Sequence, residues 1–125
     1  MIDIRPNSLT VDGVRYAAEN YPTAWASKVS GSVLEIGLGH YILGRLVASN
    51  PQVARHVIVE QSEELIKAIP VLDKTEVVHA TFPSVHLRGR FDYILMDYEG
   101  SWRDTSFAAW YLNDGGAIFV RTGTT

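Results

Sequence analysis

The sequence predicts an α/β fold in which about five parallel strands form one sheet flanked by helices, preceded by an N-terminal β-hairpin. Short apolar runs alternate with helical patterns through residues 31–121, an order typical of a parallel sheet with right-handed crossovers. The run at 56–60 is too continuously apolar for a half-exposed strand and suits a sheet covered on both faces. An Asp-Gly pair between apolar residues near the N-terminus predicts the hairpin.

The first third of the chain predicts a hairpin, a helix and a strand. The hairpin spans 9–16 and turns at Asp12-Gly13, a pair that favours the positive φ values of a type I′ turn. A helix is expected over about 22–29, since proline is tolerated in a first helical turn. The β-rich run 32–37 follows and stops at glycine.

The middle of the chain predicts two helices around the second strand. Residues 41–49 place apolar side chains on one helical face, and Asn50-Pro51 ends that helix. After the strand at 56–60, Ser62 can cap a helix that opens with the acidic pair 63–64, which suits the positive end of the helix dipole.

The last third predicts three more strands. The third strand covers 76–80 and is followed by a loop over 81–89. The fourth, 91–97, ends in an acid; a helix over about 102–112 and a turn at 113–116 then lead to a fifth strand at 117–120. That last strand would be an apolar sheet edge, and such edges favour association. We therefore expect a homo-oligomer.

Composition narrows the function. The chain has 125 residues, 46% hydrophobic and 20% charged, which predicts one packed domain over 1–125, with the hairpin and first helix in 1–30 and a core in 31–121. Its net charge of −3 and scattered basic residues argue against a nucleic-acid partner.

Several other classes of site and location are also disfavoured by the composition. There is no cysteine, and the four histidines lack metal-ligand spacing, so no metal is expected. Neither a signal pattern nor a membrane-spanning apolar run is seen, which predicts a cytoplasmic protein that does not enter membranes.

A glycine turn and an acid predict a nucleoside site. Gly37 and Gly39 lie between a strand and a helix, where bare backbone lets a ligand approach closely. Glu60 ends the next strand, and a carboxylate there can accept hydrogen bonds from both ribose hydroxyls. The sequence lacks the third glycine of the nicotinamide dinucleotide pattern, since position 42 is Ile.

Four segments, 33–39, 57–60, 91–97 and 112–118, resemble in order the motifs of class I S-adenosylmethionine-dependent methyltransferases. The resemblance implies a Rossmann-like domain, here truncated after the fifth strand, that binds S-adenosylmethionine. Tyr41 occupies a position where the family often has a third glycine, and its bulk predicts a narrower pocket floor. The cofactor residues expected on this basis are Glu35, Gly37, Gly39, His40, Glu60, Gln61, Thr81, Phe82 and Asp97.

Within that family, residues 18–22 and 96–100 resemble segments of guanidinoacetate N-methyltransferases. The likeness implies a small amine or guanidine as acceptor, with Asp97, Glu99 and Glu19 as the carboxylates that bind and deprotonate it. Residues 9–13 also resemble the hairpin of polyamine synthases, so an aminopropyltransferase, or another enzyme that consumes the same cofactor, is the first alternative. A module that binds the cofactor without catalysis is the second.

Overall fold

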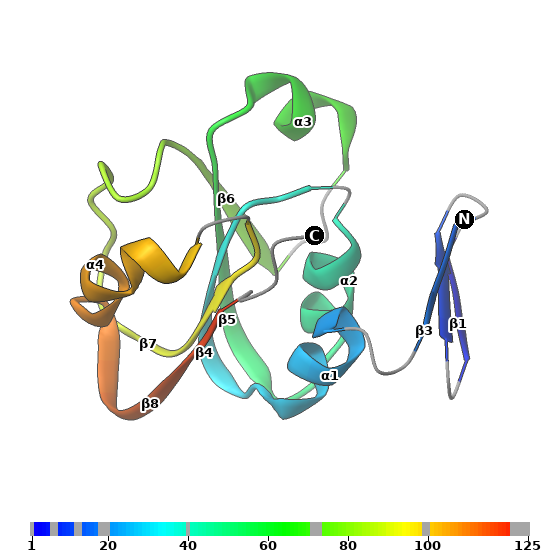
Figure 1. Ribbon diagram of the computed structural model, residues 1–125, viewed down its shortest axis with the longest axis horizontal. Helices are drawn as coiled ribbons and strands as arrows, with labels where there is room; N and C mark the ends of the chain where they lie inside the picture. Colours follow the sequence, from blue (N-terminus) through cyan, green and yellow to red (C-terminus); the bar gives the residue numbers. More distant parts are fainter. Residues whose placement is uncertain are drawn as a thin grey trace.

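The computed structural model describes residues 2–5, 8–11, 14–17, 21–39, 41–70, 74–98 and 101–120. Figure 1 shows their arrangement. In chain order the elements are β1 (Ile2–Arg5), β2 (Ser8–Val11), β3 (Val14–Ala17), α1 (Tyr21–Lys28), β4 (Gly31–Ile36), α2 (Ile42–Ala48), β5 (Val53–Glu60), α3 (Glu63–Ala68), β6 (Thr75–His79), β7 (Phe91–Met96), the 3-10 helix η1 (Ser101–Asp104), α4 (Thr105–Ala109) and β8 (Leu112–Val120).

The N-terminal strands form a separate antiparallel sheet in the order β1-β2-β3. Val11 pairs with Val14, so two residues join β2 to β3, as the Asp-Gly pair predicts. Those two residues themselves lie outside the described part of the chain. Strand β1 was not expected, although Ile2–Arg5 alternates apolar and charged residues as a half-exposed strand does.

The second sheet is fully parallel and has the strand order β6-β5-β4-β7-β8. This arrangement confirms the predicted five-stranded α/β fold. After the central strand β4, the chain adds β5 and then β6 on one side of it. It then crosses back and adds β7 and β8 on the other side. The strand order therefore reverses between β4 and β7, and ligands of open parallel sheets bind at the carboxyl ends of the strands at such a point.

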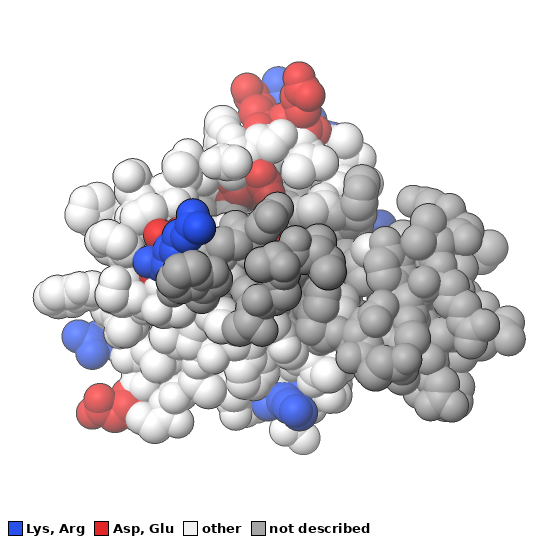
Figure 2. Space-filling view, in the orientation of Figure 1, with Lys and Arg blue, Asp and Glu red and all other residues white. Residues whose placement is uncertain are grey.

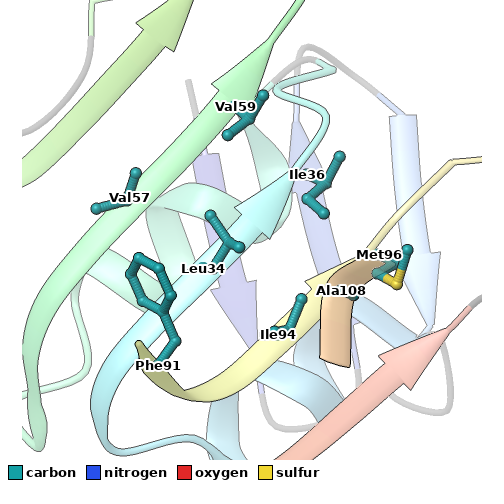
Figure 3. Packing of buried hydrophobic residues seen from close by; sticks show 8 residues of the cluster. All are labelled: Leu34, Ile36, Val57, Val59, Phe91, Ile94, Met96 and Ala108. Carbon is teal, nitrogen blue, oxygen red and sulfur yellow. The ribbon is translucent and has the colours of Figure 1, made fainter. Parts of the chain in front are cut away.

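Helices cover both faces of this sheet. Figure 1 shows α1 and α2 on one side and α4 on the other, with α3 beyond the end of β5. Alternate strand residues divide between the faces: Val33 and Leu95 pack with α1 and α2, whereas Leu34 and Ile94 pack toward Ala108 of α4. The cluster on the α4 side is drawn in Figure 3 and consists of Leu34, Ile36, Val57, Val59, Phe91, Ile94, Met96 and Ala108.

The end of the chain differs from the expectation in two ways. The helix predicted over 102–112 is a 3-10 turn followed by the five-residue α4, because the chain re-enters the sheet at Leu112. The turn predicted at 113–116 instead lies within β8. Phe91 pairs with Leu112 but Tyr93 with Ala117, so the extra β8 residues form a bulge.

The bulge is held by Asp92. The amide Nδ2 of Asn113 donates to Asp92 Oδ1 at 3.0 Å, and the backbone N–H of Ser32 donates to Asp92 Oδ2 at 3.0 Å. These two bonds, the Ser32 bond first, lower the pKa of Asp92. Asp92 thus joins β4 to the irregular start of β8.

Across the ranges that the structure describes, no helix has both the length and the apolar character needed to cross a membrane.

Candidate functional site

A cavity of about 280 Å³ lies at the carboxyl ends of β4, β5 and β7. It is therefore located where the strand order predicts a ligand. Its lining residues are Ile36, Gly37, Gly39, Val59, Glu60, Gln61, Ala80, Phe82, Asp97 and Tyr98.

The glycine turn after β4 forms one wall of the cavity. Gly37 has φ 97° and Gly39 has φ 53°, values that side chains strongly disfavour. The Gly37 N–H donates to Val59 O at 2.8 Å, and a Cβ on Gly37 would lie 3.4 Å from Asp97 O. A Cβ on Gly39 would meet nothing within 4 Å. The turn therefore leaves open space that a ligand can fill.

Glu60 connects this turn to the next helix. Its Oε1 accepts the Leu38 N–H and its Oε2 accepts the Ser62 N–H, both at 2.7 Å. The hydroxyl of Ser62 in turn caps α3 by accepting the Leu65 N–H at 3.2 Å, as predicted. Glu60 is buried, yet it lines the cavity. Each carboxylate oxygen has a second lone pair, so Glu60 can accept two further hydrogen bonds from a ligand.

Asp97 and Tyr98, the two residues that follow β7, form another wall of the cavity. The Tyr98 hydroxyl donates to Asp104 Oδ2 at 2.6 Å. Burial, and then this bond to Asp104, raise the pKa of the Tyr98 phenol, which keeps it neutral. The Ser101 N–H donates to Tyr98 O at 3.1 Å and fixes the turn between β7 and η1.

The cavity is acidic. Its lining includes Glu60 and Asp97 but no lysine or arginine among the described residues. Figure 2 shows acidic side chains over α3 and a second acidic patch below them on the same face. A cationic or N–H-rich ligand is therefore favoured over an anionic one.

Tyr41 does not narrow the cavity floor, contrary to the prediction. It has φ 61° but is fully buried and is not a lining residue. Its ring lies against Gly44, where a Cβ would overlap it, and its hydroxyl lies 3.2 Å from Thr75 Oγ1. Because its backbone is left-handed, the Tyr41 side chain points away from the cavity and lies between α2 and the sheet. Position 41 thus contributes to the core.

Glu35 belongs to a buried polar chain on the same face of the sheet. Its Oε1 lies 2.9 Å from His56 Nε2, and His56 Nδ1 lies 3.0 Å from Thr75 Oγ1, which also meets Tyr41. Burial raises the pKa of Glu35, although the bond to His56 acts in the opposite direction. From the sequence, His56 was considered only as one of four histidines without metal-ligand spacing, and Thr75 was not singled out. A histidine at the start of an apolar strand was the available signal.

The predicted site residues are therefore only partly brought together. Six of them line the cavity, namely Gly37, Gly39, Glu60, Gln61, Phe82 and Asp97. Thr81 is exposed and is not a lining residue, although its neighbours Ala80 and Phe82 are. Glu35 lies beneath the site rather than in its lining. Glu19, His40 and Glu99 fall outside the described residues, and among those described no cluster could hold a metal.

Comparison with known proteins identifies the fold. No protein-family model matches the chain, and no curated protein matches it in sequence. Among solved structures, the plantazolicin methyltransferase BpumL, crystallised with SAH, is similar at TM-score 0.63 and 20% identity, covering 80% of this chain and 42% of that one.

Two further solved structures agree. The glycopeptide N-methyltransferase MtfA, complexed with S-adenosyl-L-methionine, is similar at TM-score 0.61 and 21% identity over 78% of this chain and 50% of that one. An S-adenosylmethionine-dependent methyltransferase from Clostridium acetobutylicum is similar at TM-score 0.57 and 12% identity, over 76% and 44%. The chain thus has the Rossmann-like fold of these methyltransferases and spans about half of their length.

Proposed function

We propose that this domain binds S-adenosylmethionine and serves the transfer of its methyl group to the nitrogen of a small amine or guanidine. The observation that carries the proposal is the position of Glu60. Its carboxylate lines the cavity at the end of β5, next to the glycine turn, and both of its oxygens are held by backbone N–H groups. The fold shared with structures that hold this cofactor or its product supports the same conclusion.

The residues of the cavity fit the cofactor. Glu60 would accept the two ribose hydroxyls, since each oxygen keeps a lone pair. Phe82, with Val59 and Ala80, supplies an apolar wall for the adenine. Gly37 and Gly39 leave the backbone bare beside the ribose and the methionine portion. Glu35 would act indirectly, through the buried chain that holds the end of β4.

The acidic side of the cavity fits a nitrogen acceptor. When bound, S-adenosylmethionine would supply an electrophilic methyl group carried on a sulfonium sulfur, and that sulfur would keep the electron pair of the carbon–sulfur bond. Asp97 lines the cavity beyond Gly37 and would hold the acceptor N–H and take its proton. We assign Glu19 and Glu99 as further carboxylates for the acceptor. The structurally similar MtfA is a glycopeptide N-methyltransferase, which supports a nitrogen acceptor.

Calorimetric titration with S-adenosylmethionine, its decarboxylated form and S-adenosylhomocysteine tests the proposal. We expect binding of S-adenosylmethionine and S-adenosylhomocysteine. A preference for the decarboxylated form would favour aminopropyl transfer instead. If none of the three binds, the proposed role in cofactor binding is wrong. If the cofactor binds tightly but no amine or guanidine is methylated, the result favours a module that binds the cofactor without catalysis.

A further inference from the structure

The side chain of the residue that precedes α4 does not cap this helix. Asp104 occupies the N-cap position, where an aspartate usually accepts a backbone N–H from the first turn. Here its side chain makes no such bond. It accepts the hydroxyl of Tyr98 instead, at 2.6 Å. The carboxylate is thus directed back toward the cavity wall.

This bond determines what Tyr98 can offer to a ligand. The phenol has a single hydrogen, and Asp104 takes it, so the Tyr98 oxygen is left with acceptor capacity alone. Asp97, the neighbouring lining residue, is also an acceptor when ionised. This side of the cavity therefore presents acceptors and negative charge, and Tyr98 has no hydrogen left for an anionic ligand.

We propose that the Tyr98–Asp104 pair selects the acceptor by charge, admitting cationic or N–H-bearing groups and rejecting carboxylates and phosphates. Tyr98 is the residue that contacts the acceptor. Asp104 is a positioning residue that acts through Tyr98. It accepts the hydroxyl hydrogen of Tyr98, and its negative charge lies one hydrogen bond away from that lining residue. The inference rests on the proposed function and assigns a substrate class to its acceptor side.

Two probes of the same shape and opposite charge test the selection. Benzamidine carries a planar cationic head on a phenyl ring, and benzoate carries a planar anionic head on the same ring. Their binding is measured by NMR titration, both with S-adenosylhomocysteine present and in the free protein. We expect benzamidine to bind at the residues around Tyr98 and benzoate to bind at least about tenfold more weakly, the scale of one partly screened charge pair.

Two substitutions separate selection from structural support. Asp104→Asn keeps an oxygen that accepts the Tyr98 hydroxyl but removes the charge, and Tyr98→Phe keeps the ring but removes the oxygen. Each should reduce the preference for benzamidine over benzoate several-fold. Asp114→Asn, an exposed carboxylate on the β8 bulge, is the matched control and should leave the preference intact.

The outcomes distinguish this inference from the proposed function. If S-adenosylhomocysteine binds and the preference is absent, or is unchanged in Asp104→Asn, the selection is wrong while the cofactor assignment stands. If S-adenosylhomocysteine does not bind, the cofactor assignment fails, and the probes on the free protein still decide the selection. If Asp114→Asn weakens the preference for benzamidine as much as Asp104→Asn does, the proposed selection is also wrong, because the net charge of the protein would then explain the preference.

Discussion

The carboxylate of Glu60 accepts the backbone N–H of Leu38 at 2.7 Å, across 22 positions of the chain. Leu38 lies between the two glycines of the turn after β4, so the acid that would bind the ribose also holds the glycine turn in place. Its other oxygen holds the start of α3 through Ser62. One side chain therefore joins the glycine turn to the start of α3 without any ligand.

Replacing Glu60 should weaken cofactor binding strongly. Glu60→Gln replaces one acceptor oxygen with an NH₂ donor. That donor would face a backbone N–H, and the hydrogen bonds that the oxygen accepts from the backbone and from a ribose hydroxyl would be lost. Losing hydrogen bonds to a charged group costs about 1.5–3 kcal/mol each, so we expect affinity for S-adenosylhomocysteine to fall by at least about tenfold, measured by calorimetry. Glu64→Gln, an exposed acid on α3, should bind as the parent does. Equal affinity in Glu60→Gln would remove Glu60 from the ribose role.

Gly37 should be needed for both folding and binding. Gly37→Ala places a Cβ at φ 97°, beside Asp97 O, and we expect a loss of about 1–3 kcal/mol of unfolding free energy together with weaker cofactor binding. Gly115→Ala provides the control, because Gly115 has φ 80° with open space around it and lies away from the cavity. Chemical denaturation and calorimetry on both variants would separate strain from binding. A Gly115→Ala variant that also lost binding would contradict the assignment.

Tyr41 should matter for stability and not for the ligand. Tyr41→Phe keeps the ring against Gly44 and removes the hydroxyl that meets Thr75. We expect a loss of about 1 kcal/mol in unfolding free energy and unchanged affinity for S-adenosylhomocysteine. Altered affinity would show that residue 41 reaches the cavity after all.

Glu35 should make stability depend on pH. Burial raises its folded pKa above the ordinary value of 4.5, so the folded chain binds the proton more tightly than the unfolded chain does. This contribution to stability is present below about pH 4.5 and is lost as pH rises through the folded pKa. In Glu35→Gln that decline should be absent, so the difference in unfolding free energy between variant and parent should shift in favour of the variant as pH rises. A difference constant from pH 4 to 8 would contradict the raised pKa.

The outer edge of β8 should promote self-association. Within the described chain β8 pairs with β7 alone, and an unpaired strand edge is a template for another strand. We expect sedimentation velocity at micromolar concentration to detect a homo-oligomer. The variant Trp110→Ser serves as a control, because Trp110 is 75% exposed on the surface beside β8 and is a second apolar candidate for the contact. A monomer in the parent would contradict association, and loss of association in Trp110→Ser would move the contact from the strand edge to the aromatic surface.

Local patterns in the sequence were sufficient for most of the fold. Strand and helix periodicity predicted the five parallel strands and the helices α2 and α3, although the helix predicted over 102–112 is shorter and begins as a 3-10 turn. The Asp-Gly pair predicted a two-residue connection whose flanking strands are paired. The glycine turn and the acid at the end of β5 were also predictable, because the carboxyl ends of neighbouring parallel strands meet at one edge. These features depend on residues close together in the chain.

Tertiary structure alone decided the direction of side chains and the pairing of distant polar groups. Nothing near Tyr41 in the sequence indicates that its left-handed backbone turns the ring into the core. The meeting of Glu35 with His56, and of Tyr98 with Asp104, depends on strand register and on where η1 returns to the sheet. Burial of a polar group requires a partner, and that partner is chosen by packing between segments, which periodicity in one segment does not encode.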